Sequence, residues 1–155
     1  MSYEVERRGG EHGFTLVELL VAITIVGLLA ALAIPSFLDA QVQAGDAAAK
    51  SLAAQAYTEA ETLGLENGGS YAGVKKATLH SLDPELVTTN TAEAYLSAAS
   101  GTVDSYTLTV TSSQTGNKFT LQRRTDGTIR RSCKIPARTR PRGGCEHVSG
   151  VTGSW

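Results

Sequence analysis

The sequence predicts an α+β protein in which a long N-terminal helix packs on a small antiparallel β-sheet head. Three observations predict this class. An apolar run fills residues 14–34, an alanine-rich segment with helical spacing follows it, and short segments that alternate apolar and polar residues occupy the second half of the chain. We expect four regions: a leader (1–13), an apolar helix (14–35), an amphipathic helix (36–64) and a globular head (65–155).

The leader, residues 1–13, is polar and rich in Glu, Arg and Gly. This composition is typical of a targeting segment rather than of a folded element. Arg7 and Arg8 favour a cytoplasmic N-terminus, because positive charges concentrate on the cytoplasmic side of a membrane helix. We therefore exclude the leader from the fold.

The apolar run lies between Gly13 and Pro35, which bracket 21 residues of which only Glu18 is charged. At about 1.5 Å per residue, this length gives a helix of about 31 Å, the thickness of a bilayer core. No polar stripe interrupts its apolar surface, which argues against an ordinary surface helix. The sequence therefore predicts a membrane-spanning helix, with a bend or interruption at Pro35 because proline removes a backbone donor.

Glu18 is costly inside an apolar helix, and two interpretations stay open. A carboxylate near the end of the span can lie among the lipid headgroups. Alternatively, Glu18 pairs with a positive group. A cut before Phe14 would create an amine four residues away, on the same face of the helix.

The segment G-FTLVE, followed by the apolar run, Gly27 and Pro35, resembles the N-terminus of type IV pilins and the related pseudopilins. The resemblance implies that a prepilin peptidase cuts between Gly13 and Phe14 and methylates the amine of Phe14. It also implies that Glu18 pairs with this amine in a neighbouring subunit during filament assembly, which would give a buried carboxylate a close partner.

The alanine-rich segment 36–63 advances its apolar residues by three or four positions, which predicts an amphipathic helix with one side for a core. Gly64 is expected to cap it, and the glycines that follow predict a stop. The expected apolar face comprises Leu38, Val42, Gly45, Ala49, Leu52, Ala56, Ala60 and Leu63. The expected polar faces carry Asp39, Gln43, Asp46, Lys50, Gln55, Glu59 and Glu61.

The head begins with a mixed connection, residues 70–91, in which we expect a short helical turn or loop and a surface His80. Alternating patterns then predict three or four antiparallel strands, with turns at Gly116-Asn117 and Asp126-Gly127. One apolar face of this sheet needs a cover, which the amphipathic helix supplies. The candidate strands are 105–112, 118–125, 128–133 and, more weakly, 92–98.

The two cysteines, Cys133 and Cys145, would lie outside the cytoplasm if the N-terminus stays inside, where disulfides form. Free thiols remain an alternative, but an even pair flanked by proline and glycine favours a bridge. It would enclose eleven residues and contribute about 2–3 kcal/mol in the chain-entropy model. The resemblance adds that some pilins carry a disulfide-bounded C-terminal loop at this position.

Charge is distributed unevenly along the chain, whose net charge is only −1. From Lys118 to the end there are nine basic and two acidic residues. From Phe14 to Asn117 there are three basic and ten acidic residues. The loop between Cys133 and Cys145 is basic. We interpret it either as a solvated loop or one that pairs with the acidic part of a neighbouring subunit, or as a contact for DNA or another anionic surface. The candidate contacts are Arg138, Arg140 and Arg142.

Catalytic and metal-binding signatures are missing from the sequence. The histidines have no obvious serine or cysteine partner. From Lys118 onward the acids are Asp126 and Glu146, too few for a calcium cage built from oxygen ligands. We therefore expect no enzymatic activity, no cofactor and no metal.

The leading interpretation is a structural filament subunit that serves adhesion, motility or DNA uptake. The resemblance implies an inner-membrane precursor with its head outside, then an extracellular pilus. It also implies four partners: a prepilin peptidase, identical and related subunits, a membrane platform with an assembly ATPase, and the bilayer before assembly. A pseudopilin of a type II secretion system, forming a periplasmic filament, is the close alternative. A secreted soluble binding domain with an ordinary signal peptide cut after Ala33 is the alternative from another class.

Overall fold

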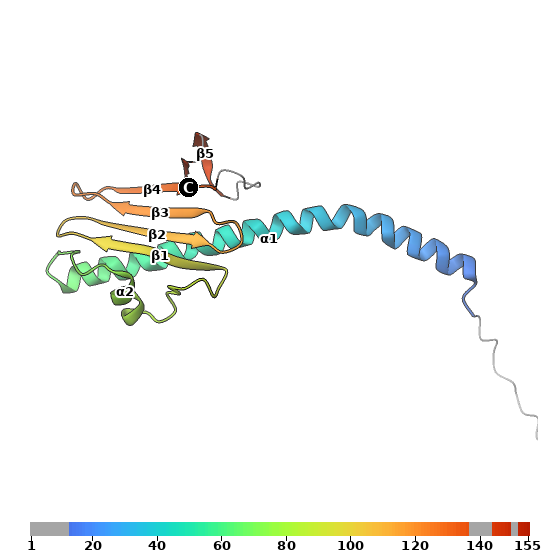
Figure 1. Ribbon diagram of the computed structural model, residues 1–155, viewed down its shortest axis with the longest axis horizontal. Coiled ribbons are helices and arrows are strands. Elements are labelled where there is room, and N and C mark those ends of the chain that lie inside the picture. Colours follow the sequence, from blue (N-terminus) through green and yellow to red (C-terminus); the bar gives the residue numbers. More distant parts are fainter. Residues whose placement is uncertain (1–12, 137–143, 150–151) are drawn as a thin grey trace, which may run out of the picture. The chain divides into compact units, whose positions relative to one another are not determined.

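The computed structural model describes residues 13–136, 144–149 and 152–155, and for residues 32–36, 38, 39 and 146–149 it describes the backbone alone. The chain divides into two units, Met1–Phe37 and Leu38–Trp155. The second unit contains a helical segment, a short helix and an antiparallel sheet (Figure 1). The α+β class predicted from the sequence is confirmed.

Helix α1, Leu16–Glu66, includes Pro35 and does not end there, so a bend at the proline stays a prediction. The helix also passes the expected cap at Gly64. Its stop lies at Gly68 and Gly69, which have φ angles of 64° and 94°, a left-handed conformation that glycine adopts at little cost. A side chain at Gly64 would collide with the ring of Tyr71, so this glycine makes room for an aromatic residue instead.

The core of the second unit lies between α1 and the sheet. Four alanines of α1, at positions 49, 53, 56 and 60, have no exposed surface, because their small side chains let the sheet approach the helix closely. The sheet contributes Leu96, Leu108, Val110, Phe119 and Leu121 to the same cluster. The prediction that Asp46 lies on a polar face is wrong: this residue is fully buried, next to the buried Gly45.

The sheet has six strands in the order β1-β2-β3-β4-β6-β5, and every neighbouring pair is antiparallel (Figure 1). Strands β1 to β4 form a meander, and two short tail strands extend it where only irregular structure was expected. These two strands escaped prediction because they are three and four residues long and lack apolar alternation. The bounds are β1 Ala94–Gly101, β2 Tyr106–Ser112, β3 Lys118–Arg123, β4 Ile129–Lys134, β5 Glu146–Ser149 and β6 Thr152–Ser154.

The connection between α1 and the sheet contains the short helix α2, Lys76–Leu82, which buries Leu79. His80 lies at the surface, as expected, and its Nδ1 is 2.9 Å from the carbonyl oxygen of Leu86. Tyr71 donates its backbone N–H to Val103, which attaches the start of the connection to the turn between β1 and β2. The connection therefore covers the β1 edge of the sheet.

Candidate functional site

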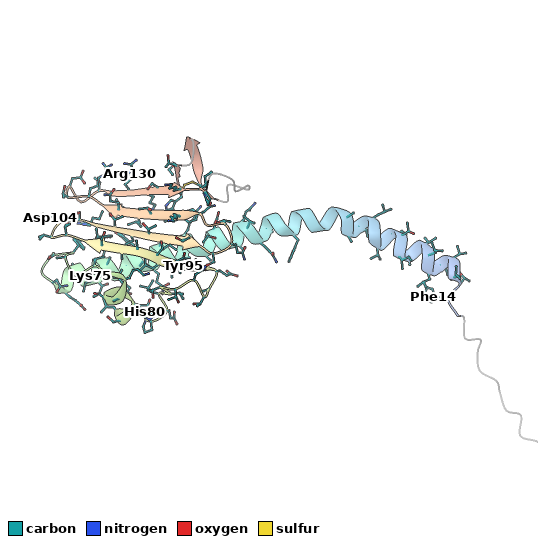
Figure 2. The ribbon with its side chains drawn as sticks, viewed as in Figure 1. Phe14, Lys75, His80, Tyr95, Asp104 and Arg130 are labelled. Atoms are coloured by element: carbon teal, nitrogen blue, oxygen red, sulfur yellow. A yellow bond between two sulfur atoms is a disulfide. The ribbon has the colours of Figure 1, made fainter. Side chains whose placement is uncertain are left out.

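The N-terminal end of α1 carries the residues for which the sequence predicts processing. Gly13 and Phe14 lie outside the helix, and both are exposed. Phe14 keeps 83% of its surface accessible and is labelled at the end of the helix in Figure 2. The Gly13–Phe14 peptide bond is therefore in non-helical backbone next to the first helical turn, where an external enzyme can reach it.

The first turn of α1 is closed by reciprocal hydrogen bonds between Thr15 and Glu18. The backbone N–H and the hydroxyl of Thr15 both donate to Glu18 Oε2, at 3.1 and 3.0 Å. The backbone N–H of Glu18 donates to Thr15 Oγ1 at 3.1 Å. This is a capping box, which satisfies N–H groups that have no partner inside the helix.

Thr15 is a functional candidate that the sequence analysis missed, although its signal was readable. Threonine followed three residues later by glutamate, just before an apolar run, is the signature of a capping box. Glu18 therefore has a partner within its own chain while the Gly13–Phe14 bond is intact. Its predicted pairing with the amine of Phe14 stays a prediction, because that amine exists only after cleavage.

The first unit exposes its apolar side chains on all sides of the helix. Each large apolar residue from Phe14 to Leu29 keeps more than half of its surface accessible. A continuous apolar surface of this extent marks a site for a lipid or protein partner. These residues are Phe14, Leu16, Val17, Leu19, Leu20, Val21, Ile23, Ile25, Val26, Leu28 and Leu29.

The predicted membrane span is not confirmed by the described part of the chain. Among the residues with described side chains, no helical stretch combines enough length with enough apolarity to span a bilayer. The predicted span reaches Pro35, whereas the described side chains of this unit run continuously only to Ala31. Gly27 lies within this stretch, and a side chain placed there would meet open space.

In the second unit, Glu61 connects α1 to the sheet and to the segment between α1 and the sheet. It accepts hydrogen bonds from the hydroxyls of Tyr71 at 2.9 Å and Tyr106 at 2.7 Å. Arg123 Nη1 lies 3.4 Å from the same carboxylate and forms an ion pair with it. Burial, together with the hydrogen bond to Glu61, raises the pKa of Tyr106 and of Tyr71 above the usual value for tyrosine.

Asp46 makes a second polar connection, at the other end of the same helical face. Thr115 donates its hydroxyl to Asp46 Oδ1 at 2.7 Å, and the amide of Asn117 donates to Oδ2 at 2.8 Å. All three side chains are buried, so each depends on the others for hydrogen bonding. This network holds the β2–β3 turn against α1.

Cys133 and Cys145 form a disulfide, with their Cα atoms 5.8 Å apart. Cys133 is on β4 and Cys145 directly precedes β5, so the bridge ties the tail strands to the meander. Beside it, Gly144 has a φ angle of 69° and approaches the Lys50 side chain of α1. The three candidate anion contacts, Arg138, Arg140 and Arg142, lie outside the described residues.

Comparison with known proteins gives matches at the N-terminal segment. A family model for the prokaryotic N-terminal methylation motif matches residues 8–34. The type IV major pilin protein PilA of Myxococcus xanthus (strain DK1622) is 44% identical over 47 residues, which cover 30% of this chain and 21% of that protein. No solved structure matches the chain. The resemblance to type IV pilins is therefore confirmed for the N-terminal segment.

Proposed function

We propose that the chain is the structural subunit of a type IV pilus-like filament and not an enzyme. One observation carries this proposal: a helix with apolar side chains exposed on every side begins at Leu16, close to the Gly13–Phe14 bond and within the matched methylation motif. Such a surface needs lipid or other apolar helices around it. A filament subunit uses both in turn, lipid before assembly and neighbouring subunits afterwards.

The proposed maturation starts with a precursor in the cytoplasmic membrane, with its head outside. The apolar sequence from Phe14 to Ile34 supports this anchor. A prepilin peptidase removes residues 1–13 and methylates Phe14. The helix then polymerises with identical or related subunits, assisted by a membrane platform and an assembly ATPase. The capping box gives Glu18 a partner before cleavage, and the amine of Phe14 becomes available afterwards.

The test is the intact mass and N-terminal sequence of the chain, purified from membranes and from sheared surface material. We expect a mature chain that begins at N-methylated Phe14, recovered with a pilus in the sheared fraction. A start at Ile34 would support the secreted-domain alternative and contradict the proposal, as would an unprocessed Met1 in cells that contain a prepilin peptidase. A processed chain confined to the periplasm would favour the secretion pseudopilin.

A matched pair of glycine substitutions tests where the peptidase cuts. We expect Gly13→Val to block processing, because the added branched side chain would obstruct access to the scissile bond. Gly10→Val, in the same leader, serves as the control and should be processed normally. Loss of processing in both variants would mean that the leader as a whole, rather than the residue before the cut, determines cleavage.

A further inference from the structure

The sheet presents a second face, directed away from the core. In β3 and β4 the core residues Phe119, Leu121 and Cys133 alternate with residues on the opposite face. The register places these outward residues in rows across the strands: Thr109, Thr120 and Ser132 in one row, Thr107, Gln122 and Arg130 in a second, and Lys118, Lys134 and Thr152 in a third. The outward face is therefore polar and basic.

A groove of about 660 Å³ follows this face along β4. A second hollow of about 220 Å³ adjoins it, because Lys134 lines both, and this hollow adds Lys118. Arg130 is labelled on the β4 side of the head in Figure 2. Its basic lining residues are Arg130, Arg131 and Lys134, and its neutral hydrogen-bonding side chains include Thr120, Gln122, Ser132 and Ser154.

Basic residues predominate on four neighbouring strands of the sheet. Strands β2, β3, β4 and β6 contain five basic residues and no acid. Arg123 pairs with Glu61, and Arg131 lies 5.5 Å from the centre of the Trp155 ring. The remaining three, Lys118, Arg130 and Lys134, form no ion pair or side-chain hydrogen bond with the described residues.

Two of these cations face each other. Lys118 and Lys134 are direct cross-strand partners, and like charges in this arrangement destabilise a sheet. An anion bound between the strands would remove this repulsion. The groove therefore combines a cavity, cations that have no ion pair among the described side chains, and an electrostatic cost that a ligand would offset.

We propose that this groove binds an acidic polysaccharide whose charges are widely spaced. Arg130 and Lys134 are four residues apart on β4, a separation of about 13 Å, and neutral donors and acceptors lie between them. This pattern fits a chain of sugars in which carboxylates alternate with hydroxyl groups. It fits nucleic acid less well, since duplex DNA carries one charge per about 1.7 Å and none of the described residues that line the groove is aromatic and able to stack on a base.

The experiment uses the full chain in detergent and measures binding calorimetrically. The probes are a hyaluronan oligosaccharide, with a carboxylate on every second sugar, and a neutral dextran oligosaccharide of equal length. We expect binding of hyaluronan that weakens as salt is raised, and no detectable binding of dextran. The measurement does not depend on filament assembly, so its outcome is separate from that of the proposed function.

Substitutions then locate the binding site. Arg130→Gln combined with Lys134→Gln should weaken hyaluronan binding by about tenfold or more, because two exposed charge contacts are lost. Arg130→Lys keeps the charge and should retain most of the affinity. Lys75→Gln removes an exposed cation that Figure 2 shows on the opposite side of the head, and should have no effect.

Three results would overturn the proposal. One is equal binding of hyaluronan and dextran, and another is unchanged hyaluronan binding by the double variant. The third is tighter binding of a single-stranded oligonucleotide that the same double variant abolishes, which would make the groove a nucleic-acid site. Near-ultraviolet circular dichroism of each variant verifies the fold, and the single Arg130→Gln variant replaces the double one if the latter unfolds.

Discussion

The two units of the chain place the same kinds of apolar residue in opposite environments. In the first unit, Leu20 keeps 54% of its surface exposed, whereas in the head Leu108 has none. The second unit buries Leu96, Leu108 and Leu121 of the sheet in a core shared with α1, so it supplies its own stability. The first unit leaves its large apolar side chains exposed, a surface typical of a site for a lipid or protein partner. The comparison separates residues that stabilise the fold from residues that leave an apolar surface exposed.

The largest expected effect comes from the matched pair Leu108→Ala and Leu20→Ala. Leu108→Ala leaves a cavity in the core and should lower the free energy of unfolding of the head by about 2–5 kcal/mol. Leu20→Ala should leave head stability unchanged, because the side chain has no core partner to lose. Urea unfolding of the detergent-solubilised chain, followed by tryptophan fluorescence, measures both. Equal destabilisation would show that the two units unfold together.

Removing the disulfide should have the next largest effect. The double variant Cys133→Ala and Cys145→Ala releases a loop of eleven residues and should destabilise the head by about 2–3 kcal/mol. The same urea titration of the wild-type chain with reductant is the control, since it breaks the bridge without changing the sequence. A variant as stable as the oxidised wild type would mean that the tail strands hold their place without the bridge.

Asp46 tests the polar part of the contact between α1 and the sheet. Asp46→Ala removes both hydrogen bonds and leaves Thr115 and Asn117 buried without this partner, at a cost of about 2–3 kcal/mol. Asp104→Ala removes an exposed acid in the turn between β1 and β2 and should be neutral within about 0.5 kcal/mol. If Asp46→Ala is equally neutral, the β2–β3 turn is held by the apolar contacts alone.

The tyrosines bonded to Glu61 predict a loss of stability in alkali. The folded state raises the pKa of Tyr106 and Tyr71, so above pH 10 the unfolded chain releases protons that the folded chain retains. The free energy of unfolding therefore keeps its full value below pH 10. Above pH 10 it falls, by up to about 1.4 kcal/mol per pH unit for Tyr106. Tyr106→Phe should flatten this decline, whereas Tyr95→Phe serves as a control. Urea midpoints measured between pH 8 and 12 give the slopes.

Local patterns predicted the elements whose signals are repetitive. The alternation of Tyr106, Leu108 and Val110 predicted a strand, and the spacing of Ala49, Ala56 and Ala60 predicted the buried face of the helix. In both cases the period of the side chains matches the period of the element. The N-terminal motif was readable for a different reason, since a short run of defined residues carried it.

Features that depend on distant partners could not be read in the same way. Asp46 looks like a surface acid until the β2–β3 turn brings Thr115 and Asn117 to it, from about seventy residues away in the sequence. The basic groove requires the register of β3 and β4, which places Lys118 beside Lys134. Gly64 resembled a helix cap from its local sequence. The structure shows that it leaves room for the ring of Tyr71, and this depends on the path of the chain after the helix.

The smallest expected effect concerns the first turn of α1, in the first unit, where the side chains of Thr15 and Glu18 form the capping box. Thr15→Ala removes the capping box, so amide hydrogens of the first turn should exchange about fivefold faster. Thr24→Ala is the matched control: its hydroxyl bonds to the carbonyl of Leu20 in mid-helix, and its loss frees no N–H group. Faster exchange in both variants would mean that the helix frays throughout. Faster exchange confined to Thr15→Ala would show that the cap fixes where the helix begins, and so keeps the Gly13–Phe14 bond outside it.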